Sequence, residues 1–324
     1  MQGGTIIDAS GLSAYDSEND GGNRLIARLF VLFQLMRPLQ WVKNSIIYFA
    51  LVFTVNEWKA LEGFHQDLEM IALATGSFIS FCLLSSAVYI INDITDASQD
   101  RIHPWKRYRP IASGRFSVIG AAVVGSILLI LGLALAYILN LWLALVAITY
   151  VFLTIGYSFG LKRLPIIDVF TLSGGYVLRA AAGAVAISAP ISPWLYIVTG
   201  LGAMLIGFGK RRAELELASS WEAAIQQRHV FRGYSIRLLD QLISVVATST
   251  LVSYILYTFT ANGVGANWMM ISIPFVVYGL FRYLILIYHE NVGERPGEEL
   301  LMDRPLVMTV ILWLTTVITI LLFV

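Results

Sequence analysis

Three aspartates lie close together after the second long apolar run of the sequence. Asp93, Asp96 and Asp100 are separated by three and then four residues, so a helix continuing through them would carry all three carboxylates on one face. Carboxylates so close repel one another unless a cation joins them, and their oxygens suit a hard ion such as Mg²⁺. The spacing therefore predicts a magnesium site formed by the three aspartates, with Asn92 assisting.

Basic residues follow these aspartates after a short gap. Lys106 and Arg109 can contact phosphate oxygens directly, and arginine can do so through a bidentate fork. Mg²⁺ held by a few carboxylates normally completes its shell with water and substrate phosphates, so the combination indicates a diphosphate substrate. The alternative is a solvated helix end with scattered charges. The segregation of acids and bases into two groups beside an apolar run disfavours that alternative.

Two later connections between apolar runs carry further candidate residues. For the basic candidates, anchoring on the cytoplasmic side of the membrane is nearly as good an explanation as phosphate binding. An aspartate that starts a helix is also favourable beside the positive end of the helix dipole. The candidates for substrate binding are Tyr157, Lys162 and Asp168 in the first connection and Lys210, Arg211, Arg212 and Glu214 in the second.

Arg179 lies eleven residues beyond Asp168 within an apolar run, which places it about 16 Å deeper if the run is helical. A cation at that depth must face protein or water and is a functional-site hypothesis by default. Its expected partner is a carboxylate of the first cluster or a substrate phosphate. A structural ion pair within the bundle is an equally weighted alternative.

The elements that must position these residues are membrane helices. Of the 324 residues, 57% are hydrophobic and 13% charged, and the mean hydropathy is +0.73, which excludes two soluble domains, a disordered chain and a coiled coil. The sequence predicts an all-α polytopic membrane protein. Nine spans are expected at about 40–56, 70–91, 116–138, 141–159, 166–187, 193–209, 237–260, 267–288 and 305–323.

The first residues differ in composition from the rest. Residues 1–23 are rich in Gly, Ser, Asp and Asn, as expected of a disordered tail. Basic and apolar residues interleave over about 24–37, which predicts a short helix along the membrane surface. We therefore expect a membrane-embedded catalytic domain over 24–324.

The distribution of basic residues predicts an orientation. With the N-terminus inside, all of the 22 Lys and Arg residues except Lys59, Arg179 and Arg282 fall in inner connections, as the positive-inside rule requires. The C-terminus is then outside, and a central cavity is expected to face the cytoplasm of a bacterial plasma membrane.

A net charge of +1 gives no indication of a nucleic-acid partner. The sequence leaves the oligomeric state open, and a homo-oligomer is compatible with it.

The chain resembles the UbiA superfamily of intramembrane prenyltransferases over nearly all of its length after about residue 28. The resemblance is carried by the segment from Asn92 to Gly114, by the nine expected spans and by the pattern of Tyr157 and Lys162. Members of that superfamily carry a second Asp-x-x-x-Asp motif in the sixth connection, where this chain has KRRAEL from Lys210. With the segment HPWKRYRPIASG over 103–114, this departure is similar to the decaprenyl-phosphate phosphoribosyltransferase branch.

The resemblance implies transfer of 5-phosphoribose from phosphoribosyl pyrophosphate to a polyprenyl phosphate, for arabinan precursors of the cell wall. It implies catalytic roles for Asp93, Asp96, Asp100 and Lys162, with Mg²⁺ as cofactor. One alternative is an aromatic polyprenyltransferase of quinone synthesis, which would share the fold, the metal and the first motif. The other is a transporter or lipid-binding scaffold without chemistry.

Overall fold

The computed structural model describes residues 30–54, 64–102, 106–190, 192–260, 268–289 and 303–323, and it contains no strand over these residues. Its elements are η1 (Pro38–Tyr48), α2 (Phe49–Phe53), α4 (Phe64–Thr95), α5 (Ala97–Ile102), η2 (Lys106–Tyr108), α6 (Val118–Leu139), α7 (Leu141–Phe159), η3 (Leu161–Arg163), α8 (Ile167–Ala186), α9 (Pro193–Glu216), α10 (Trp221–Gln227), η4 (His229–Gly233), α11 (Ile236–Thr260), η5 (Trp268–Ser272), α12 (Ile273–His289) and α14 (Arg304–Phe323). The expected all-α class is confirmed.

Seven helical segments of the described chain are long and apolar enough to cross a membrane. They lie at Asp67–Thr95, Val118–Leu139, Leu141–Phe159, Ile167–Ala186, Ile236–Phe259, Trp268–Tyr288 and Arg304–Phe323. The expected spans at 40–56 and 193–209 are also largely helical, but they are not among the seven. The integral membrane character is therefore confirmed, while the count of nine spans stays a prediction.

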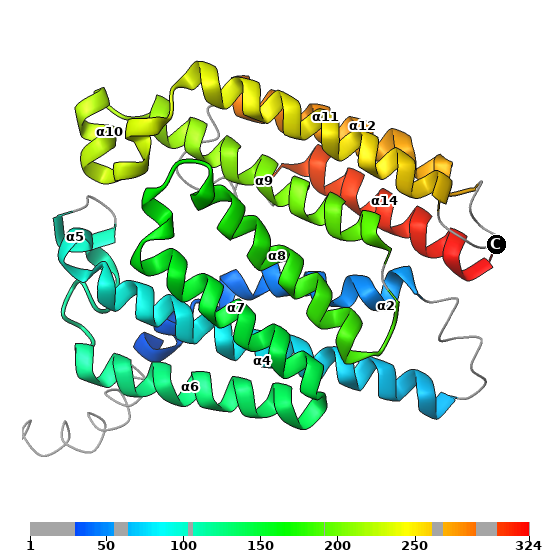
Figure 1. Ribbon diagram of the computed structural model, residues 1–324, viewed down its shortest axis with the longest axis horizontal. Coiled ribbons are helices and arrows are strands. Elements are labelled where there is room, and N and C mark those ends of the chain that lie inside the picture. The colour runs from blue at the N-terminus through cyan, green and yellow to red at the C-terminus, as the bar shows by residue number, and fades with distance from the viewer. Residues whose placement is uncertain are drawn as a thin grey trace, which may run out of the picture.

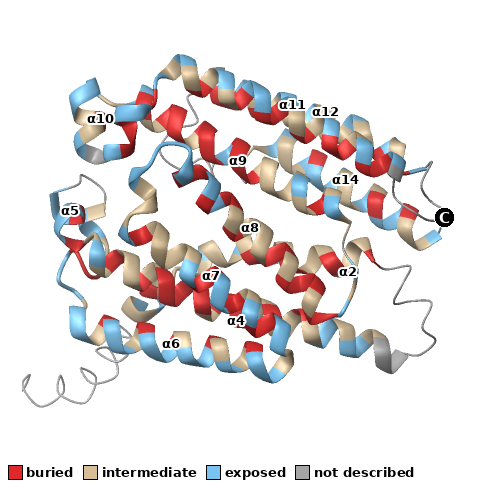
Figure 2. Cartoon of the chain, viewed as in Figure 1, coloured by how far each residue is buried: buried red, intermediate tan, exposed pale blue. Residues whose placement is uncertain are grey.

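The outer faces of the bundle are apolar, as a lipid environment requires. On α6, Ile119, Val123, Ile127 and Ile130 are exposed, whereas its opposite face buries small residues such as Gly132. Figure 2 shows the same division, with exposed surface on the outer side of α6 and buried residues toward α4 and α7. Small residues at a helix interface let the backbones approach closely, which is how membrane helices gain packing energy without a hydrophobic effect between them.

Helix α8 lies at the centre of the bundle, between α7 and α9 (Figure 1). Its later half contributes Ala182, Ala184 and Ala186 to a core shared with α4 and α7. Its first turn contributes Val169 to a second core, formed mainly by α9, α11 and α12. The start of α8 therefore joins the two halves of the molecule, at the end of the bundle near α5 and α10.

Asn140 separates α6 from α7, which confirms the interpretation of 116–159 as two spans. Its backbone is extended, and its side-chain Oδ1 accepts a hydrogen bond from the Trp142 backbone N–H at 2.8 Å. An asparagine in this position satisfies a backbone donor that the first turn of α7 leaves without a helical partner.

The first expected span begins as a 3₁₀ helix of eleven residues, η1, rather than as an α-helix. Runs of 3₁₀ helix longer than three or four residues are uncommon, and a tertiary contact accompanies this one. A Cβ atom added to Gly183 of α8 would lie 2.0 Å from the carbonyl oxygen of Ile47. The backbone of η1 therefore rests directly on α8 where a side chain is missing.

Of the expected interfacial helix at about 24–37, the described residues 30–36 are helical. The remainder of that segment and the expected tail at 1–23 lie outside the described residues.

Replacing Gly183 by Ala should destabilise the bundle by about 1–3 kcal/mol, because neither backbone can yield without separating η1 from α8. Gly202→Ala is a matched control, since a Cβ atom there has no neighbour within 4 Å and alanine favours a helix. Thermal unfolding of both variants in detergent measures the difference. Equal melting temperatures for the two variants would contradict the close contact.

Candidate active site

The candidate residues gather at one end of the bundle, where α4, α7 and α9 end and α8 begins. We call this the loop end. In Figure 1 it is the end that carries α5 and α10, opposite the C-terminus. Three short elements, η2, η3 and η4, lie in its connections. The segment at 103–105, part of the pattern that resembles the phosphoribosyltransferase branch, lies outside the described residues.

Asp93 and Asp100 converge on one guanidinium group. Arg109 Nη1 donates to Asp93 Oδ1 at 3.1 Å and to Asp100 Oδ2 at 2.7 Å, so these carboxylate oxygens are at most about 6 Å apart. Arg37 Nη2 also donates to Asp93 Oδ1. Asp93 and Asp100 are buried, and burial raises the pKa of Asp100 although Arg109 opposes it. Each buried acid is therefore compensated by arginine.

Asp96 has separate partners. The chain turns at Asp96 between α4 and α5, although its backbone N–H still donates to Asn92 O at 2.9 Å as in a helix. Lys162 Nζ of η3 donates to Asp96 Oδ1 at 2.6 Å, and Asn92 Nδ2 donates to Asp96 Oδ2 at 3.1 Å. Lys162, a candidate phosphate ligand from a later connection, thus lies beside the aspartates.

Among the described residues, no group of three or more His, Cys, Asp or Glu side chains is close enough to hold a metal ion. The donor set nevertheless fits Mg²⁺ chemically, because it consists of carboxylate and amide oxygens. Arg109 Nη1 lies between Asp93 and Asp100 as a cation shared by two carboxylates. A divalent ion at this place would have to take over that role.

A second group forms where α8 starts and α9 ends. Arg211 is fully buried and its Nε donates to Asp168 Oδ2 at 2.7 Å. Its other nitrogens donate to Glu214 Oε2 at 2.9 Å and to the hydroxyl of Tyr157 at 3.3 Å. Four candidates from three helices are therefore joined by a single guanidinium group.

Tyr234, in the connection between η4 and α11, forms hydrogen bonds with this group. Its hydroxyl donates to Asp168 Oδ1 at 2.7 Å and accepts from the Ile166 backbone N–H at 2.6 Å. Burial and the bond to Asp168 raise the pKa of Tyr234, so the phenol remains a donor. Ile166 has a φ of 69°, a strained value for a β-branched residue. Tyr234 thus stabilises an unfavourable backbone conformation that directs α8 and Asp168.

Glu214 is surrounded by cations. Its Oε2 is 2.9 Å from Arg211 Nη1 and 3.2 Å from Arg228 Nε, and its Oε1 is 4.0 Å from Lys210 Nζ. Burial would raise the pKa of Glu214, but Arg228, Arg211 and Lys210 outweigh it and lower that pKa to about 2. The carboxylate is therefore ionised throughout the physiological pH range.

The pKa of Lys210 is lower than that of an ordinary lysine. Burial lowers the pKa of Lys210 to about 8, with Arg228, Arg211 and Lys43 adding to the decrease and Glu214 opposing it. Lys106 follows the same pattern, because burial, Arg228 and Arg109 lower its pKa while Asp100 and Glu214 raise it. Cations that destabilise one another in this way are suited to receive an anion.

Arg212 does not join these groups. Its guanidinium donates to Asp240 at 2.7 Å and to Glu216 at 2.6 Å and lies over the ring of Tyr288. These partners belong to α11, α9 and α12, so Arg212 links helices on the other side of α9.

Arg179 has neutral hydrogen-bond partners. Its nitrogens donate to Asn44 Oδ1 at 2.7 Å, to the Gly175 carbonyl at 2.9 Å and to the Tyr150 hydroxyl at 2.8 Å, and it lies over the rings of Tyr150 and Tyr176. No ion pair of Arg179 is present among the described residues. Its contacts tie α8 to α7 and η1, with cation–π attraction in place of a counter-ion.

Three contributors to the site were not anticipated from the sequence. Arg37 and Arg228 were interpreted only as basic residues that favour the cytoplasmic side, and Tyr234 was not considered. Arg37 adopts the αL conformation (φ 53°), which its position before Pro38 does not predict. No spacing rule connects Arg228 or Tyr234 with residues some fourteen to sixty-six positions away in the chain.

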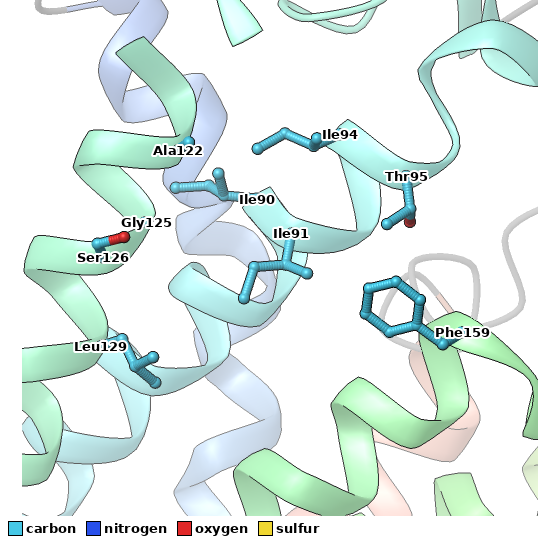
Figure 3. A pocket seen from close by; sticks show the side chains of 9 residues that line it. All are labelled: Ile90, Ile91, Ile94, Thr95, Ala122, Gly125, Ser126, Leu129 and Phe159. Atoms are coloured by element: carbon cyan, nitrogen blue, oxygen red, sulfur yellow. The ribbon is translucent and has the colours of Figure 1, made fainter. Parts of the chain in front are cut away.

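An apolar cleft of about 230 Å³ lies between α4, α6 and the end of α7 (Figure 3). Apart from the hydroxyl groups of Thr95 and Ser126, its lining is hydrocarbon, and it contains none of the expected site residues. The lining residues are Ile90, Ile91, Ile94, Thr95, Ala122, Gly125, Ser126, Leu129 and Phe159. The cleft therefore offers no cation for a phosphate and differs from the expected central cavity.

Comparison with known proteins agrees with this geometry. The model of the UbiA prenyltransferase family matches residues 49–297. The chain is 34% identical to a decaprenyl-phosphate phosphoribosyltransferase of Mycobacterium tuberculosis, with 87% of this chain and 91% of that protein covered. It is 32% identical to the protein of the same name in Corynebacterium glutamicum, with 87% and 84% covered.

Among solved structures, the fold is similar to a UbiA homologue from Archaeoglobus fulgidus bound to GPP and Mg²⁺. The TM-score is 0.68, the identity is 18%, and 90% of this chain and 99% of that chain are covered. The family match over most of the chain, the related sequences and the shared fold lead to one conclusion: the protein belongs to the UbiA prenyltransferase family.

Proposed function

We propose that this protein transfers 5-phosphoribose from phosphoribosyl pyrophosphate to a polyprenyl phosphate and releases pyrophosphate. The observation that carries the proposal is the pairing of an acidic group (Asp93, Asp96 and Asp100) with a cation-rich group around Glu214 at the same end of the bundle. Relatives that match over most of their length carry the name decaprenyl-phosphate phosphoribosyltransferase. A reaction that brings several phosphates together needs such additional protein cations.

The acidic group is assigned to the diphosphate of the donor. Asp93, Asp96 and Asp100 with Asn92 would hold Mg²⁺, which supplies positive charge to the departing pyrophosphate when bound. The Archaeoglobus homologue of similar fold binds GPP together with Mg²⁺, which supports a divalent ion in this fold. Arg109 and Lys162 already touch the aspartates, so they are within reach of the same phosphates, and Lys106 neutralises further charge.

The acceptor requires no general base. A lipid phosphate is already ionised at neutral pH, so one of its oxygens can attack the anomeric carbon as the bond to pyrophosphate breaks. Attack from the opposite face inverts the configuration at that carbon. The protein's residues contribute by positioning the two substrates, stabilising negative charge and limiting the access of water. Lys210, supported by Arg211, binds a phosphate other than the departing diphosphate.

The loop end is assigned to the cytoplasmic side of a bacterial plasma membrane, because the basic residues of the sequence concentrate in the connections there. Nine crossings, with the C-terminus outside, complete the proposed topology. A 3₁₀ helix rises about 2.0 Å per residue, so residues 38–53 extend about 30 Å and are long enough to cross the hydrocarbon core. Helix α9 has 24 residues and is also long enough.

Two substrate pairs distinguish this activity from aromatic prenyl transfer. Purified protein with Mg²⁺ should release pyrophosphate from phosphoribosyl pyrophosphate and polyprenyl phosphate, and should form the lipid-linked phosphosugar. Polyprenyl diphosphate with a hydroxybenzoate should give no product. Turnover of the second pair, or of neither pair, would contradict the proposal.

Replacing Asp93 or Asp96 by Asn should reduce turnover by about 10²-fold or more, because each change removes a charged oxygen that would hold the Mg²⁺ needed by the leaving group. Asp67→Asn, in the first turn of the same helix α4 at the opposite end of the bundle, is the control and should retain activity. Radiolabelled transfer with saturating Mg²⁺ measures the effect. Wild-type turnover in either site variant would refute the role assigned to that aspartate.

The donor kcat/KM should fall as the pH rises through about 8. Lys210, which faces Glu214, Arg211, Arg228 and Lys43, loses its proton there, and the neutral amine attracts phosphate less strongly. Below that pH the lysine is charged, and the donor kcat/KM should no longer change with pH. Lys210→Arg keeps the charge because arginine stays protonated, so this inflection should disappear. An unchanged inflection in the arginine variant would show that another group titrates.

A further inference from the structure

Among the residues that the structure describes, the environment of Glu214 contains more positive than negative charge. Lys210, Arg211 and Arg228 approach this one carboxylate, and Asp168 compensates only Arg211. Like charges grouped this closely repel one another unless an opposite charge joins them. The excess cations therefore favour an anion at this place.

The cations around Glu214 differ in their access to a ligand. The Arg211 side chain is 2% exposed, whereas those of Arg228 and Lys210 are 28% and 41% exposed. Arg211 is also committed to Asp168 and Tyr157. An anion would thus be contacted by Lys210 and Arg228, while Arg211 and Glu214 hold these two residues in place from behind.

Lys106 connects this group with the aspartates. Its amino group interacts electrostatically with Asp100 and Arg109 and also with Glu214 and Arg228. A molecule with two separate anionic groups would match such an arrangement. A phosphorylated sugar with a diphosphate at its other end is a molecule of this kind.

We infer that Lys210 and Arg228, positioned by Glu214 and Arg211, bind the phosphate monoester of the sugar donor while its diphosphate lies toward the aspartates. This assignment rests on the proposed function and extends it, because it names the phosphate and adds Arg228 as a substrate-binding residue. Arg228 and Lys106 lie in connections beyond the apolar helices. A water-soluble donor reaches such residues, whereas the isoprenoid chain keeps a lipid phosphate close to the bilayer.

Direct binding of ribose 5-phosphate tests the assignment independently of turnover. We expect Arg228→Gln in the full-length protein to weaken ribose 5-phosphate binding about tenfold or more, the usual scale for loss of a charge-assisted contact. Arg232→Gln is the matched control, since Arg232 is exposed on the adjacent 3₁₀ element and should bind as the wild type does. Arg228→Lys, which keeps the charge, should recover part of the affinity and guards against a loss caused by misfolding.

Competition experiments identify which phosphate is bound. In Arg228→Gln, the KM for the sugar donor should rise about tenfold, while the KM for polyprenyl phosphate and the inhibition constant for pyrophosphate should stay within about twofold. Equal binding of ribose 5-phosphate by Arg228→Gln and wild type would overturn the assignment. A rise confined to the KM for polyprenyl phosphate would overturn it as well. Absence of any phosphoribosyl transfer by the wild type would instead refute the proposed function, and ribose 5-phosphate binding would still report on the cation group.

Discussion

The buried ion pair between Asp168 and Arg211 is the interaction on which the loop end depends. It joins the first turn of α8 to the last turns of α9, and each partner is fixed again by another element, Asp168 by Tyr234 and Arg211 by Tyr157. Removal of Arg211 would leave the buried Asp168 without a cation among the described residues, which is costly in a low-dielectric environment. The pair therefore sets the positions of the residues around Glu214 as well as the contact between the two halves of the bundle.

Charge at this end is organised by sign. The aspartates lie at the end of α4, at the following turn and in α5. They are neutralised by Arg109 of the same connection, by Arg37 before η1 and by Lys162 of η3. The excess of cations lies at the end of α9, around a single glutamate. Substrates with several phosphates can therefore meet carboxylates on one side, where a divalent ion fits, and protein cations on the other.

Local patterns in the sequence predicted much of this structure, because they depend on neighbours in the chain. The apolar runs specified the helices, and Asn140 specified the break between α6 and α7. The spacing of Asp93 and Asp100 predicted that these two carboxylates lie close together, but not that they share Arg109. Long-range pairings could not be obtained in the same way. Asp240 of α11 turns Arg212 away from the site, and nothing near Arg212 in sequence indicates that partner.

The 3₁₀ geometry of η1 belongs to the same class of features that local patterns miss. The apolar composition of 40–56 is compatible with any helix that can cross a membrane, and hydropathy does not distinguish an α-helix from a 3₁₀ helix. The contact that accompanies the observed geometry, between the Ile47 carbonyl and Gly183, joins residues more than a hundred positions apart. Sequence periodicity carries no information on such an approach.

Arg109 between Asp93 and Asp100 has a consequence for biogenesis. Because an internal guanidinium already offsets the repulsion between these two carboxylates, the polypeptide can insert and assemble in the bilayer without first acquiring an inorganic ion. Assembly of the helices would then not depend on a divalent ion, in contrast to small zinc domains, which fold only when the metal is bound.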